Sequence, residues 1–274
     1  MTAARRLGYT ERLTRPSSTQ DHSRLLEKVR GLERKHDRTD VGVHSTRVSF
    51  EAGELCDRIG MDPESKSIVM LAARCHDVGK VWISDATLNH DGPLDQAMRA
   101  EIETHARSSL AILKRVPGVP DDVLSVAVYH HEEYDGGGYE GLRGEEIPLA
   151  ARVVQICDVF DAVASPRAYK KGQSRAATLA AMTSDDARFG RRMFDPLLLR
   201  GFVAAKLEKG VDGLDPATER ELRNYVDSDP LADVAPDQVA ALRERMDAIG
   251  FDAGTFAAAR RHDPAPEPLT LARP

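Results

Sequence analysis

The sequence predicts an all-α fold, and three observations lead to that prediction. Apolar residues recur at helical spacing along most of the chain, and no run of convincing length alternates as a strand does. The pairs Asp62-Pro63 and Asp195-Pro196 resemble helix beginnings, with an N-cap followed by proline at the first helical position. Charged residues make up 30% and aromatic residues only 5%, which is typical of soluble proteins rich in amphipathic helices.

Start and stop signals divide the first half of the chain into five helical stretches. Gly60 and Gly79 end two of them, because glycine favours helix C-termini. A loop is expected over residues 84–93, and residues 134–139 form another, because three successive glycines there disfavour a helix. In order, the expected helices cover residues 21–36, 40–59, 62–79, 95–116 with a break near His105, and 121–133.

The second half begins with a strongly apolar helix over residues 148–163, which Pro166 ends. Later helices are expected at residues 175–184, 196–208, 216–227 and 236–249. We expect a disordered lead over residues 1–20, a main domain over 21–209, a helical appendage over 210–262 and a disordered tail over 263–274. The appendage helices are amphipathic, and we expect them to pack on their own domain rather than pair with a second copy.

Charge and composition exclude several classes of protein. The formal net charge of −6 differs from the basic footprint of proteins that bind duplex nucleic acid. An anionic substrate would therefore need local cations or metal ions. The three scattered cysteines indicate a reduced, cytoplasmic protein rather than a disulfide framework. The chain shows neither a membrane-spanning apolar run nor a secretory signal.

Histidines and carboxylates recur close together on segments that are expected to be buried. Taken singly, each has a simpler explanation as a packed or solvated side chain, or as a helix N-cap. The histidines are His44, His76, His105, His130 and His131, and the accompanying carboxylates are Asp40, Asp77 and Asp158. Together they favour a metal site.

Burial makes the metal interpretation physically stronger. His76-Asp77 ends an apolar helix, Asp158 is flanked by apolar residues, and Asp161 lies one turn further on. A buried carboxylate is costly unless it is paired or bound to a metal ion. The chain has no Cys-x-x-Cys pair, so structural zinc is disfavoured. Imidazole and carboxylate ligands suit Fe, Mn or similar divalent ions.

The order of these residues resembles that of a known family. His76-Asp77, with His44 before it and Asp158 after it, resembles the H…HD…D signature of the HD phosphohydrolase superfamily. Further matches are typical of its HD-GYP branch: HDVGK (76–80), His105, HHEEYDGGGYEGLRGEEIPLAARVVQICDVFDAV (130–163), SPRAYKK (165–171) and FDP (194–196). The resemblance covers roughly residues 40–205.

The resemblance implies an HD-domain helical bundle, here with extra C-terminal helices, and a phosphodiesterase holding two or three divalent ions, Fe or Mn. The ligand positions map onto His44, His76, Asp77, His105, His130, His131 and Asp158, with Asp40 a candidate for a third ion. A hydroxide between metals bridged by Asp77 would attack cyclic di-GMP, giving linear pGpG and then GMP. Lys80 is expected in catalysis and phosphate contact. The other expected substrate contacts are Tyr139, Asp161, Arg167 and Lys170.

One position departs from the family's pattern. The chain has Gly138-Tyr139-Glu140 where the family has Gly-Tyr-Pro. Proline would stiffen the loop by fixing φ, which glutamate cannot do. Glu140 also places a negative charge where an anionic substrate would approach. We expect catalysis to be retained, and the contacts of this loop with substrate or partners to differ.

Two other functions stay open on sequence alone. One is hydrolysis of another cyclic dinucleotide, nucleotide or phosphate ester, and the other is a catalytically weak protein that binds the dinucleotide or a partner. Metal-dependent turnover would separate an enzyme from a scaffold. The sequence leaves open whether the chain forms a homodimer or binds a partner signalling protein.

Overall fold

The computed structural model describes residues 19–36, 39–166, 172–186 and 189–249, and within them it contains helices and no strand. This confirms the all-α prediction. The helices are α2 (Thr19–Lys35), α3 (Thr39–Arg58), α4 (Pro63–Cys75), α5 (Asp85–Leu88), α6 (Gln96–Leu113), α7 (Asp121–Tyr129), α8 (Leu149–Ala164), α9 (Arg175–Met182), α10 (Pro196–Lys209), α11 (Pro216–Asp227) and α12 (Val239–Ile249). Short 3₁₀ turns are η1 (Val78–Trp82), η2 (Gly144–Glu146), η3 (Arg191–Met193) and η4 (Pro230–Asp233).

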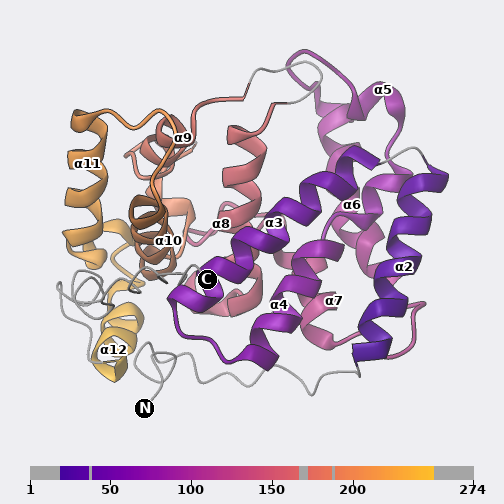
Figure 1. Cartoon of the computed structure of the whole chain (residues 1–274), viewed down its shortest axis with the longest axis horizontal. Helices are drawn as coiled ribbons and strands as arrows, with labels where there is room; N and C mark the ends of the chain where they lie inside the picture. Colours follow the sequence, from indigo (N-terminus) through magenta and orange to yellow (C-terminus); the bar gives the residue numbers. More distant parts are fainter. Residues whose placement is uncertain (1–18, 37–38, 167–171, 187–188, 250–274) are drawn as a thin grey trace, which may run out of the picture.

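The core is built around α3, α4 and α8. Figure 1 shows α2, α5, α6 and α7 at one end of the molecule and α9 to α12 at the other, with α3, α4 and α8 between them. α8 is buried along most of its length because its residues are apolar on nearly every side. It packs against α3, α4, α7, α9 and α10, so residues on α8 face the interior from a fixed position.

The two predicted Asp-Pro helix beginnings are present. Asp62 accepts hydrogen bonds from the backbone N–H groups of Glu64 and Ser65, and Pro63 is the first residue of α4. Asp195 caps α10 in the same manner. Each cap satisfies backbone donors that have no partner within the helix.

Three predicted boundaries are wrong. α4 ends at Cys75 instead of continuing to Gly79, and η1 follows it. Packing is close at Gly79, where a Cβ atom would lie 2.2 Å from the backbone oxygen of His105. α6 passes through His105 without a break, and α7 stops at Tyr129 rather than continuing to residue 133.

The C-terminal helices pack on the rest of the chain. Their buried side chains belong to the same apolar core as α3 and α8: Leu222, Tyr225, Val226 and Leu242. The buried guanidinium of Arg200 on α10 pairs with Asp233 at 2.6 Å. The predicted lead lies outside the described residues except for its last two, which begin α2, and the predicted tail lies wholly outside them.

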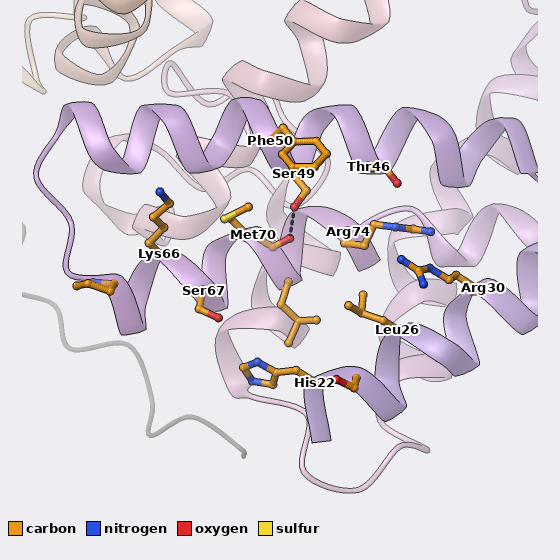
Figure 2. A pocket seen from close by; sticks show the side chains of 13 residues that line it. His22, Leu26, Arg30, Thr46, Ser49, Phe50, Lys66, Ser67, Met70 and Arg74 are labelled. Atoms are coloured by element: carbon orange, nitrogen blue, oxygen red, sulfur yellow. Dashed lines mark hydrogen bonds between the residues drawn. The ribbon is translucent and has the colours of Figure 1, made fainter. Parts of the chain in front are cut away.

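A groove of about 600 Å³ lies between α2, α3 and α4. Figure 2 shows Leu26 and Arg30 of α2 opposite Phe50 of α3 and Met70 of α4. None of the histidines and carboxylates predicted to bind metal lines this groove. Among the described helices, none combines the length and the hydropathy that a bilayer crossing requires.

Candidate metal centre

Five helices bring the predicted ligands together in the interior. The contributing residues are His44 on α3, His76 and Asp77 just after α4, His105 on α6, His130 and His131 just after α7, and Asp158 on α8. Their ligand atoms form three groups, each within 4.8 Å: Asp77, His105, His130 and His131; His44, His76 and Asp77; and His76, His130 and Asp158. The four ligands contributed by α4 and α7 therefore lie directly after the last residues of these helices.

Backbone carbonyls fix three of the imidazoles. Nδ1 donates to the carbonyl one turn earlier, from His76 to Ala73 at 2.7 Å, from His105 to Ile102 at 2.6 Å and from His130 to Val126 at 2.9 Å. A carbonyl oxygen only accepts, so Nδ1 of each ring must carry hydrogen. In the neutral ring, Nε2 then presents a lone pair, which is the arrangement that a metal ion needs.

The Nε2 lone pairs of His105 and His130 converge, and the ring of His131 lies beside them. Nε2 of His105 lies 3.2 Å from Nε2 of His130 and 3.2 Å from Nε2 of His131. Burial lowers the pKa of all three rings, that of His131 to about 3, so they are neutral near pH 7. Converging neutral acceptors repel unless a cation lies among them.

Asp77 lies between the two sets of histidines. Its Oδ2 is 3.2 Å from Nε2 of His76, and its Oδ1 is 3.3 Å from Nε2 of His105. Burial opposes ionisation, but positive charge on His76 and Lys80 holds the pKa of Asp77 well below its usual value. Burial disfavours that charge on His76, but Asp77 and Asp158 raise the pKa of His76 to about 10 in the metal-free protein. Asp77 Oδ1 and His76 Nε2 are both buried without a hydrogen-bond partner. Such atoms are costly unless an ion binds them.

Asp161 supports His44 from behind. Its Oδ2 accepts from Nδ1 of His44 at 2.6 Å, while Nε2 of the same ring faces Asp158 Oδ1 at 2.9 Å. Arg47 binds the Asp161 carboxylate with two donors, at 2.6 and 2.8 Å. Burial would raise the pKa of Asp161, but the bonds from His44 and Arg47 lower it to about 2. The ring is thereby held in one orientation.

Two of the predicted substrate contacts, Lys80 and Tyr139, lie at the edge of this centre. Nζ of Lys80 is 2.5 Å from Asp77 Oδ2. The ring of Tyr139 is centred 4.7 Å from that of His131, and Tyr139 is partly exposed. Arg167 and Lys170 lie outside the described residues.

Asp40 is exposed in the first turn of α3 and belongs to none of the three groups. Its predicted role with a third ion remains a prediction.

Sequence reasoning missed two contributors. Arg47 lies three residues after His44, so helical spacing alone would have placed it on the same face. Glu132 directly follows the histidine pair and is fully buried, where its carboxylate accepts two backbone N–H groups of the glycine-rich loop. The cysteines Cys56, Cys75 and Cys157 are buried and free, and none joins the metal groups.

The donors fit divalent ions of the first transition row. Each group offers imidazole nitrogen and carboxylate oxygen and no thiolate. Bound cations would satisfy the unpartnered buried atoms and the converging lone pairs together. The described part of the chain therefore contains a cluster whose donors fit divalent metal ions.

Comparison with known proteins identifies the family of the chain. The family model described as "HD domain" matches residues 23–193. The chain is 35% identical over 216 residues to the cyclic di-GMP phosphodiesterase response regulator RpfG of Xanthomonas campestris, covering 75% of this chain and 54% of that protein. It is 35% identical over 133 residues to the 3'3'-cGAMP-specific phosphodiesterase 2 of Vibrio cholerae, which covers 48% of this chain and 26% of that protein.

A solved structure shares the fold. Bd1817, a HDG"Y"P protein from Bdellovibrio bacteriovorus, matches with a TM-score of 0.52 and 17% identity, over 63% of this chain and 54% of that one. The chain spans about half the length of RpfG and about a quarter of the Vibrio protein, so these relatives contain long segments beyond the matched part.

Proposed function

The chain belongs to the HD domain family, in its HD-GYP branch, and we propose that it is a metal-dependent phosphodiesterase that opens cyclic di-GMP to linear pGpG. The observation that carries the proposal is the arrangement of six predicted ligands around Asp77, in which Asp77 Oδ1 and His76 Nε2 are buried without a hydrogen-bond partner. Hydrolysis onward to GMP would use the same site.

Two metal positions are supported by the geometry. Asp77 belongs to two of the three groups, one with His44 and His76 and the other with the remaining histidines, so its carboxylate would contribute to both ion positions. Fe or Mn suits these donors. A third ion would require Asp40, which stays a candidate.

Bound divalent ions would supply an activated water and offset the negative charge of the phosphodiester. The chain's own residues position these parts. Asp161 and Arg47 hold His44 in orientation, and Asp77 keeps Lys80 at the edge of the centre. There the ammonium of Lys80 is placed to contact the phosphate or the leaving oxygen.

Substrate contacts complete the proposal. Tyr139, packed on His131, offers a ring for contact with a base. Arg167 and Lys170 are proposed as phosphate contacts on sequence grounds, because arginine binds phosphate oxygens in pairs. We propose that the protein acts in the cytoplasm. Either a homodimer or a complex with a signalling protein is compatible with this proposal.

The test is hydrolysis by the reconstituted protein. The chain is purified anaerobically, loaded separately with Fe(II) and Mn(II), and given cyclic di-GMP while products are separated by chromatography. Asp77→Asn keeps the side-chain shape but weakens the bridge, and Asp57→Asn, an exposed residue, is the matched control. We expect metal-dependent pGpG from the wild type and the control, and loss of at least about 100-fold in Asp77→Asn.

A parallel reaction with 3'3'-cGAMP addresses the second candidate, which the Vibrio relative's name favours. A kcat/KM more than about tenfold higher for 3'3'-cGAMP would reassign the substrate. A folded, metal-loaded protein that turns over neither compound would refute the enzyme proposal and leave a binding role.

A further inference from the structure

The glycine-rich loop over residues 134–144 lies directly on the metal centre. A Cβ atom at Gly138 would lie 2.4 Å from Cα of Glu132 and 2.7 Å from the backbone oxygen of His131, so glycine permits this close approach. The approach brings Tyr139 onto the ring of His131. Whatever holds this loop therefore also sets where Tyr139 lies.

Glu132 holds the loop from inside. Its side chain is fully buried, and its two oxygens each accept one backbone N–H, Oε1 from Glu140 at 2.7 Å and Oε2 from Leu142 at 2.6 Å. Hydrogen bonds to a charged acceptor are about twice as strong as neutral ones, and a buried carboxylate that lost them would carry a large penalty. Both bonds require a backbone donor at their position.

Glu140 holds the loop from outside. Its Oε2 accepts from Nη2 of Arg107 on α6 at 2.7 Å. Arg107 is largely exposed, so this pair contributes little to stability. It does place a cation against the carboxylate of the residue that follows Tyr139, a proposed substrate contact.

We propose that Glu132 and Glu140 form a two-part latch that holds Tyr139 against His131, in place of the stiffening that a proline at position 140 would give. Glu140 is a positioning residue through its backbone N–H, which proline lacks, and Arg107 neutralises its side chain. Restoring proline would therefore loosen the loop instead of stiffening it. The latch stands on the geometry alone, and only its effect on substrate rests on the proposed function.

Amide hydrogen exchange tests the latch without any turnover. The probe is the Leu142 amide, which every variant keeps. Glu140→Pro and Glu132→Gln should each speed its exchange about tenfold or more. Glu140→Pro removes one of the two backbone donors, and Glu132→Gln removes one of the two acceptor oxygens, so each breaks the paired hydrogen bonds. Glu140→Gln, which keeps the backbone donor and loses the ion pair, should stay within about fivefold of wild type.

If the Leu142 amide stays as protected in Glu140→Pro as in the wild type, the latch is overturned. That variant changes a loop position, so the result stands even if Glu132→Gln does not fold.

Kinetics with cyclic di-GMP test the charge role. Arg107→Gln should raise KM severalfold with kcat nearly unchanged, because it leaves the Glu140 carboxylate without its cation. Adding Glu140→Gln to that variant should restore KM. An unchanged KM in Arg107→Gln would overturn the charge role, and absence of turnover in the wild type would contradict the proposed function while leaving the exchange result intact.

Discussion

Asp161 and His44, which lie 117 positions apart in the sequence, are joined by a 2.6 Å hydrogen bond. Arg47 donates a hydrogen bond to the same carboxylate. The bond fixes the His44 ring, which contributes to one of the metal groups. An outer partner of this kind tunes the affinity of the ligand it holds.

Asp161→Asn should weaken metal binding about 10- to 100-fold, because the ring of His44 loses its charged acceptor. Arg47→Gln should weaken it about tenfold or less, since Arg47 acts through Asp161. Competition titration of Mn(II) against a chelator gives both values. Arg58→Gln removes another α3 arginine, which pairs with Glu208, and should leave affinity unchanged. Equal affinities in wild type and Asp161→Asn would contradict this role.

Removing His105 should separate stability from metal binding. In His105→Leu, one of the converging acceptors becomes apolar, so the metal-free protein should lose little stability or gain some. The rise in melting temperature on adding Mn(II), which the wild type should show, should be largely abolished. Calorimetric scans with and without chelator measure both quantities. A variant that melts far below the chelated wild type would show that these rings do not repel in the metal-free protein.

Gly79→Ala should destabilise the fold by about 1–3 kcal/mol or more, because the new Cβ meets backbone atoms of His105 and Ser109 that cannot move independently of α6. Urea unfolding measures the change.

Gly31→Ala is the matched control for Gly79→Ala. It lies in α2 with open space around it and should stabilise by up to about 1 kcal/mol. Similar effects from the two substitutions would exclude steric contact as the cause.

The buried ion pairs of Asp195 should make the stability of the protein depend on pH. Burial would raise its pKa, but Arg245 and Arg152, at 2.8 and 2.7 Å, lower it. A lowered folded-state pKa gives stability that is present above the unfolded value of about 3.9 and is lost as pH falls through the folded value. Asp195→Asn should therefore cost about 3–5 kcal/mol at pH 7, and less as the pH falls below about 4.

Denaturant unfolding of wild type and Asp195→Asn at pH 7, 5, 4 and 3 measures the difference in their free energies of unfolding. Asp57→Asn, at an exposed pair, should differ from wild type by less than about 1 kcal/mol throughout. A difference for Asp195→Asn that grows toward low pH would reverse the assigned sign.

Local signals in the sequence predicted what depends on local chemistry. The Asp-Pro pairs gave helix beginnings because an N-cap and a fixed φ act within one turn. Motif order predicted the ligands that the structure gathers around Asp77. The contribution of Arg47 was missed because its partner is 114 residues away, and sequence spacing does not report which helices meet.

The boundary errors have a similar origin. Helical periodicity favoured a helix up to Gly79, but the α-helix ends at Cys75 and the 3₁₀ turn that follows packs against α6. Likewise, nothing near Glu132 indicates that its carboxylate would bind the loop that follows it. Such contacts are decided by tertiary packing, which overrides local preference.

The residues just before α12 contact the glycine-rich loop, and these contacts matter when the domain is moved into another protein. Gln238 donates to the carbonyl of Tyr134 at 2.7 Å, and Asp237 pairs with Arg143 at 2.9 Å. A graft that carried residues 23–193 alone would leave both loop residues without these partners and would separate Arg152 from Asp195. A chimera designer should therefore carry the chain through residue 249, because the unit that can be exchanged intact is longer than the stretch that sequence similarity marks.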